Sequence, residues 1–217
     1  MTGIMNTATI LIADDHTLIC DALRKMIEPP HQVVGTVNDG LSLLKTAAAL
    51  HPDVVLLDIA MPLRNGLDAG RQLKQMLPKT ILLFLTMNPD WDLAAEAFRV
   101  GASGYLLKNS AGPELLKAID QVLRGGKYVT PPIAQGMEQV SFRDPQALTH
   151  TKKLTDRQRE VLQLIAEGYS MEQIGLHLKI ATRTVAFHKY RIMEEFGIAN
   201  NAELVRFALK RHLVSVS

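Results

Sequence analysis

The feature that most constrains this chain is a fivefold alternation of short apolar segments with amphipathic segments over its first 130 residues. Strands that are apolar throughout must be covered on both faces, which is typical of parallel sheets with helices on either side. The sequence therefore predicts an α/β domain with a doubly wound, five-stranded parallel sheet. The expected strands are 9–13, 33–37, 54–57, 80–85 and 104–107, and the expected helices are 16–27, 41–50, 67–76, 90–100 and 113–123.

The alternation ends at a stretch after residue 128 that is rich in proline and glycine. These residues interrupt regular structure and are typical of linkers. Beyond this stretch the pattern is helical throughout. We therefore expect a first domain over residues 1–128, a linker over 129–150 and a smaller, all-α second domain over 151–217.

Two capping boxes open helices in the second domain. Thr155 is followed three positions later by Gln158, and Ser170 by Gln173, which is the spacing at which each side chain can bond the other residue's backbone. Two further helices are expected over 182–196 and 202–213. Capped helices joined by short turns in this order are typical of a helix-turn-helix domain.

Charge and cysteine content narrow the class of protein. The chain has 24 basic and 22 acidic residues; residues 1–130 hold 12 basic and 13 acidic ones, which leaves 12 and 9 for the rest. The second domain therefore carries the basic excess that contact with nucleic acid requires. The single cysteine, Cys20, cannot form a disulfide within the chain, and no apolar run approaches the roughly 18 residues of a membrane helix. We expect a cytoplasmic protein that does not enter a membrane.

Polar residues follow four of the five expected strands, where a strand interior would reject them. They are Asp14 with Asp15, Asp58, Thr86 and Lys108. Because the carboxyl ends of parallel strands meet at one edge, these side chains are expected to share a pocket. Three carboxylates favour a hard divalent cation such as Mg²⁺. Asp58 is then placed to attack a phosphoryl group, whose oxygens Lys108 and Thr86 would neutralise and hydrogen-bond.

Residues 8–124 resemble the receiver domain of bacterial two-component response regulators, which has a flavodoxin-like sheet. The matching text is ADDH, LLDIAMPLRNG, LFLTM and GYLLKN, in that order. The resemblance implies that a sensor histidine kinase phosphorylates Asp58 and that Mg²⁺ is required. It assigns the metal contacts to Asp15, Asp58 and the backbone carbonyl of Ala60, with Asp14 helping. It also implies that Thr86 and Tyr105 move when the phosphoryl group arrives.

The expected third helix of the second domain carries a mixture of basic and apolar residues. The basic ones, expected to face an anionic groove, are Arg183, His188, Lys189 and Arg191; the apolar ones, expected to pack, are Val185, Phe187, Ile192 and Phe196. Residues 152–213 resemble the DNA-binding domain of the NarL/FixJ regulators, the LuxR-type helix-turn-helix, in LTDRQREVLQLIAEGYSMEQIG, LKIATRTVAFHKYRIM, Gly197 and AELVRFAL. That resemblance places the segment around Thr184, Val185, His188 and Lys189 in the major groove of double-stranded DNA.

Some positions depart from the family pattern. The serine that usually caps the recognition helix is Ala181, so Thr182 is expected to cap it one residue later. Lysines common in the family are here Glu172, Ala186 and Glu195, and their loss should weaken the sequence-independent part of DNA affinity.

The leading hypothesis is a transcriptional regulator, not an enzyme, in which phosphorylation of Asp58 controls homodimerisation and DNA binding. One alternative is a magnesium-dependent phosphatase with an aspartate nucleophile. Such enzymes usually carry a second aspartate two residues later, where this chain has Ala60. Another is a phosphorylation-responsive protein-interaction regulator with weak or no DNA binding, which Glu172 and Glu195 would favour.

Overall fold

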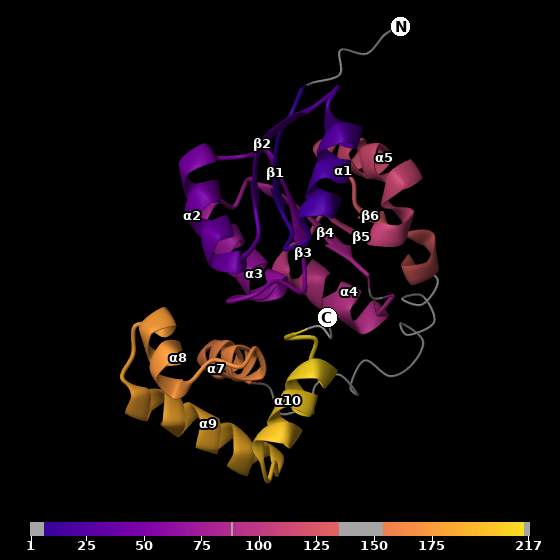
Figure 1. Cartoon of the computed structure of the whole chain (residues 1–217). Coiled ribbons are helices and arrows are strands. Elements are labelled where there is room, and N and C mark those ends of the chain that lie inside the picture. The colour runs from indigo at the N-terminus through magenta and orange to yellow at the C-terminus, as the bar shows by residue number, and fades with distance from the viewer. Residues whose placement is uncertain (1–6, 88, 135–153, 215–217) are drawn as a thin grey trace, which may run out of the picture. The chain divides into compact units, whose positions relative to one another are not determined.

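The computed structural model describes residues 7–87, 89–134 and 154–214, and these form two compact units (Figure 1). Each described helix is too short or too polar to cross a membrane. The strands are β1 (Thr9–Ala13), β2 (Gln32–Val37), β3 (Val54–Asp58), β4 (Ile81–Thr86), β5 (Gly104–Leu107) and β6 (Tyr128–Val129). The first unit also holds the helices α1 (Thr17–Ile27), α2 (Gly40–Leu50), α3 (Gly66–Met76), α4 (Trp91–Val100) and α5 (Ala111–Leu123).

The first unit is a doubly wound parallel sheet, as the alternation predicted. Its strand order is β2-β1-β3-β4-β5-β6, and every adjacent pair is parallel. One face packs against α1 and α5 and the other against α2, α3 and α4, which gives two separate apolar cores (Figure 1). The chain reverses its winding between β1 and β3, which is where sheets of this type bind ligands.

The sheet differs from the prediction in its sixth strand. Tyr128 and Val129 pair with β5, Leu107 donates its backbone N–H to Thr130 Oγ1 at 3.2 Å, and Ile133 is buried in the core. The packed part of this unit therefore continues beyond the boundary expected at residue 128. A two-residue strand is too short to leave a periodic signal. The remainder of the expected linker, from residue 135, lies outside the described residues.

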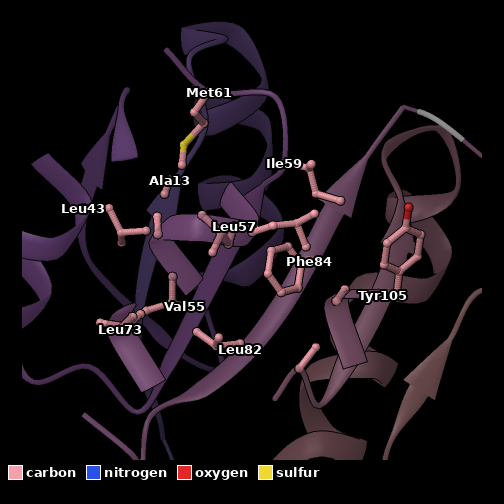
Figure 2. Close-up of a cluster of buried hydrophobic side chains, with 14 of the residues drawn as sticks. Ala13, Leu43, Val55, Leu57, Ile59, Met61, Leu73, Leu82, Phe84 and Tyr105 are labelled. Carbon is pink, nitrogen blue, oxygen red and sulfur yellow. The ribbon is translucent and has the colours of Figure 1, made fainter. Parts of the chain in front are cut away.

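A row of large side chains crosses the middle of the sheet on the side of α2, α3 and α4. Leu57 pairs with Phe84 across β3 and β4, and Phe84 with Tyr105 across β4 and β5, so all three lie in one buried layer (Figure 2). Interiors of this kind are close-packed and resist deformation. The strand ends that follow these residues, including Asp58, are therefore held by a rigid core.

The second unit consists of α7 (Asp156–Ala166), α8 (Met171–Leu178), α9 (Thr182–Phe196) and α10 (Asn201–Lys210) among the described residues. Both capping boxes are confirmed at the starts of α7 and α8. The cap expected at Thr182 is wrong. Thr182 is already the first residue of α9, and the N-cap position falls to Ala181, whose methyl group cannot accept a hydrogen bond.

Candidate functional site

The polar residues that end the strands meet at one edge of the sheet, as predicted. Asp14 follows β1, Asp58 is the last residue of β3, and Lys108 follows β5. The Lys108 ammonium Nζ lies 2.7 Å from Asp14 Oδ2 and 2.8 Å from Asp58 Oδ2. The parallel topology thus assembles a buried cation between two carboxylates that are distant in sequence.

The acidic cluster at this edge includes one residue that the sequence analysis did not assign to it. Asp14, Asp15, His16 and Asp58 each offer a potential ligand atom, and these atoms lie within 4.8 Å of one another. The ring of His16 is on the surface, but its Nδ1 lies 3.1 Å from Asp14 Oδ1 and 2.8 Å from Asp15 Oδ1. Its position directly after the acidic pair was the available signal. Oxygen donors outnumber nitrogen in this set, which suits a hard cation.

The electrostatics of the pocket favour the charged form of Lys108 beside Asp58. Burial raises the pKa of the Asp58 carboxyl group, and the nearby Lys108 only partly offsets that effect. Burial alone would lower the pKa of Lys108, but the attraction and hydrogen bonds of Asp58 and Asp14 outweigh it and raise the pKa. Asp58 Oδ1 also accepts a hydrogen bond of 2.7 Å from the backbone N–H of Ile59. Its two oxygens therefore have different, fixed partners.

The loop after β3 depends on a glycine whose role the sequence analysis missed. The backbone N–H of Gly66 donates to the carbonyl of Ile59 at 2.8 Å, which folds the loop back over the end of the strand. A Cβ atom at residue 66 would lie 2.0 Å from the carbonyl oxygen of Asp58. Only glycine permits this approach. The role expected for the Ala60 carbonyl remains a prediction.

Thr86 and Tyr105 lie in the core beside the pocket. Tyr105 is fully buried, and Thr86 is buried at the end of β4. Burial and the nearby Asp90 raise the pKa of Tyr105, while a hydrogen bond with Thr86 acts in the opposite direction. The Tyr105 hydroxyl group also lies 3.5 Å from the backbone carbonyl of Asp90, to which it donates. The two residues are therefore coupled in this structure, and their movement on phosphorylation remains a prediction.

Helix α9 agrees with the packing prediction at Val185 and differs from it at Phe187. Val185 is fully buried in the core of the helical unit, as expected for an apolar residue of this helix, although the resemblance also placed it in the segment that enters the groove. Phe187, expected to pack, is 58% exposed. A helix that mixes apolar and basic residues has two possible inner faces, and packing against the neighbouring helices decides which one is buried.

The other residues expected to contact DNA are all accessible to some degree. Arg183 and Arg191 are exposed, and Thr184, His188 and Lys189 are half-buried. Burial, followed by the charge of Arg157, lowers the pKa of His188.

Comparison with known families accounts for both units. The family model of the response regulator receiver domain matches residues 10–120, and that of the bacterial regulatory proteins of the luxR family matches residues 152–208. The chain is a response regulator of the NarL/FixJ type. Response regulators of this type are DNA-binding transcription factors and not enzymes, which rules out the phosphatase alternative.

Relatives with both domains align with this response regulator along nearly their whole length. It is 35% identical to the oxygen regulatory protein NreC of Staphylococcus aureus, covering 94% of this chain and 98% of NreC. It is 31% identical to the transcriptional regulatory protein DegU of Brevibacillus brevis, covering 97% of both chains. A solved structure of two RcsB dimers bound to two parallel DNAs matches with a TM-score of 0.58 and 26% identity, covering 93% of this chain and 98% of that one.

Proposed function

We propose that this response regulator acts in the cytoplasm, where Asp58 accepts a phosphoryl group from a sensor histidine kinase. The observation that carries the proposal is the contact of Lys108 with Asp58 and Asp14 in one buried pocket. A carboxylate held with a cation at the carboxyl edge of a parallel sheet is suited to nucleophilic attack on a phosphoryl group. The receiver family of the chain supports the same role.

The transfer requires few groups of the protein. One oxygen of Asp58 attacks phosphorus, and the bond from phosphorus to the donor's imidazole nitrogen breaks. The imidazole leaves with the electron pair of that bond, and the product is an acyl phosphate on Asp58. Lys108 already lies beside Asp58 Oδ2 and can hold a transferred phosphoryl oxygen by charge and hydrogen bonding. A carboxylate nucleophile loses no proton, so no general base is needed.

The donor set fits Mg²⁺, as carboxylate oxygens predominate in it. We propose that Asp14, Asp15, Asp58 and the carbonyl of Ala60 hold the ion. When bound, the ion offsets the charge of the carboxylates and of the incoming phosphoryl group. The single ammonium of Lys108 cannot neutralise three carboxylates, which is why phosphorylation is expected to require the metal.

The assignment of Asp58 is tested with a small phosphodonor. Purified full-length protein should be labelled by acetyl phosphate in the presence of Mg²⁺, and Asp58→Asn should abolish the labelling. Asp53→Asn is the matched control, because Asp53 directly precedes the same strand at its opposite end and is exposed. Full labelling of Asp58→Asn, or of the wild type in excess chelator, would contradict the proposal.

We further propose that phosphorylation acts through Thr86 and Tyr105 to promote homodimerisation, and that the dimer binds double-stranded DNA. A ligand shifts a conformational equilibrium only through contacts that differ between the two states. We propose that the Thr86 hydroxyl group exchanges its present hydrogen bond with Tyr105 for one with the phosphoryl group. The structure of RcsB dimers on DNA supports the dimeric form.

This coupling is tested by analytical ultracentrifugation of Thr86→Ala. The variant should be phosphorylated by acetyl phosphate but should stay in the distribution of the unphosphorylated protein. Thr80→Ala is the control, because Thr80 is equally buried and directly precedes the same strand. Normal dimerisation of phosphorylated Thr86→Ala would exclude this route.

A further inference from the structure

The outward face of α9 carries two aromatic side chains. Val185 and Ile192 are fully buried and mark the inner face of the helix. On the opposite side, at helical spacing, lie five exposed residues: Arg183, Phe187, Tyr190, Arg191 and, in the last turn of the helix, Glu194. We call the first four the recognition stripe.

The exposure of these aromatic residues is unusual for this chain. Phe187 is 58% and Tyr190 61% exposed, and among the described residues they are the only aromatic side chains in the exposed apolar set. The other aromatic side chains of the described residues are either buried, as are Phe84 and Tyr105, or half-buried. Neither ring contributes to the core of the helical unit. Single exposed apolar residues are ordinary, but two adjacent rings on one helix face indicate a binding surface.

The surroundings of the two rings indicate a polyanion as the occupant. The guanidinium group of Arg191 lies 5.8 Å from the centre of the Phe187 ring, and Lys189 Nζ lies 5.6 Å from that of Tyr190. Cations set against the rings would be desolvated unfavourably by an apolar protein surface. They suit a partner that combines negative charge with small apolar groups.

The major groove of DNA is such a partner. The methyl group that it presents is the 5-methyl of thymine, and phosphates line its edges. An aromatic ring can cover a methyl group but cannot form the paired hydrogen bonds that identify guanine or adenine. Residues three apart on a helix are separated by about 4.5 Å along its axis, close to the roughly 3.4 Å rise of one base pair. The two rings can therefore reach neighbouring base pairs.

We propose that Phe187 and Tyr190 are specificity-determining residues that contact thymine methyl groups, while Arg183 and Arg191 contact phosphate. The proposal rests on the proposed function, since it requires that α9 enters the major groove. It predicts that the preferred sites contain thymines at one or two positions whose identity is read through the methyl group alone.

The test removes the methyl groups from the DNA. Duplexes are enriched from a random library with full-length protein treated with acetyl phosphate and Mg²⁺. In an enriched duplex, each thymidine is then replaced in turn by deoxyuridine, which pairs identically and lacks only the methyl group. Replacement at one or two of the positions should lower the affinity of the wild-type protein about fourfold, which is the effect of losing one buried methyl-sized group.

The protein variants identify which ring reads which base. Phe187→Ala and Tyr190→Ala should each bind the thymidine duplex more weakly and should each lose the sensitivity to one of the replacements, as a double-mutant cycle requires. Both side chains are exposed, so the variants should keep the helical content of the wild type. Tyr190→Phe keeps the ring and should keep the sensitivity. Arg183→Ala should weaken binding to every duplex and keep the sensitivity as well.

The outcomes separate this inference from the proposed function. Failure to enrich any duplex would overturn both, because α9 would then not bind DNA. Enrichment of a duplex whose affinity is unchanged by every replacement would overturn only the role of the rings. Equal sensitivity in the wild type and in both alanine variants would do the same.

Discussion

Lys108 Nζ lies 2.8 Å from Asp58 Oδ2, and the lysine side chain is only 4% exposed. The two residues belong to strand ends separated by β4 in the sheet. A buried ion pair of this kind contributes little net stability, because desolvation offsets its attraction. The ion pair matters instead for the charge of the pocket, because the ammonium group of Lys108 favours the charged form of the buried Asp58 carboxylate.

Lys108→Met should destabilise the metal-free protein by about 3 kcal/mol at neutral pH, because it leaves two buried carboxylates without their cation. The loss should shrink as the pH falls. Burial already raises the pKa of Asp58, and removing Lys108 raises it further above the unfolded value of about 3.9. At a pH between the unfolded pKa and the raised pKa of Asp58 in the folded variant, the folded state binds more protons than the unfolded state. Lowering the pH in this range therefore restores stability. Urea unfolding in chelator at pH 7.5 and pH 5 measures the difference.

Lys45→Met is the matched control for that prediction. Lys45 is exposed on α2, and its replacement should change the free energy of unfolding by less than about 0.5 kcal/mol at either pH. A penalty for Lys108→Met that is the same at both pH values would show that Lys108 is not the counter-ion of the buried carboxylates.

Mg²⁺ should stabilise the receiver domain against unfolding. At a concentration about 100 times the dissociation constant, a ligand of the folded state adds about 2.7 kcal/mol to the free energy of unfolding. Asp15→Asn should reduce this gain, whereas Asp21→Asn, an exposed change on α1, should not. Thermal unfolding with and without the ion measures both variants. An equal Mg²⁺ effect in Asp15→Asn and the wild type would remove Asp15 from the ligand set.

The sequence predicts the acidic pocket well because its geometry follows from topology. Once the strands are parallel, Asp14, Asp58 and Lys108 must share an edge, and the capping boxes are local in the same way. The conformation around Gly66 could not be predicted, because it depends on an approach between backbone atoms that leaves no periodic pattern. Phe187 was wrongly expected to pack for a related reason. The mixed pattern of α9 allows both Val185 and Phe187 to be core residues, and only packing against the other helices selects Val185.

Gly66→Ala should disturb the loop that follows Asp58. The added Cβ would lie 2.0 Å from the Asp58 carbonyl oxygen, so the backbone must shift. We expect a destabilisation of about 2 kcal/mol and slower labelling by acetyl phosphate. Gly112→Ala is the control, because a Cβ there meets no atom within 4 Å. Wild-type stability and labelling in Gly66→Ala would mean that the loop adapts at no cost.

Ala181→Ser should stabilise the start of α9. The N-cap residue of this helix has the extended backbone of a capping position but no side-chain hydrogen bond. A serine there should contribute about 1 kcal/mol, and amide hydrogen exchange in the first turn should slow by about fivefold. Ser170→Ala is the reverse control, because it removes an existing cap on Gln173 N and should speed exchange at α8. Faster exchange in the first turn of α9 in Ala181→Ser would show that the serine hydroxyl group does not cap the helix and bonds another group.

Ala186→Lys should strengthen DNA binding without changing its sequence preference. Ala186 is half-buried, lies on α9 between the inner face and the recognition stripe, and stands where the family commonly has lysine. One added phosphate contact should steepen the slope of log affinity against log salt by about 0.9. Ala202→Lys adds the same charge on the exposed start of α10 and should leave the slope unchanged. Titrations of an enriched and a random duplex at several salt concentrations measure both variants.

The two duplexes also test what residue 186 contacts. Because a phosphate contact does not depend on base identity, the affinity for both duplexes should rise by the same factor in Ala186→Lys. A gain confined to the enriched duplex would instead place residue 186 against a base, and the recognition stripe would then not be the face of α9 that meets the groove.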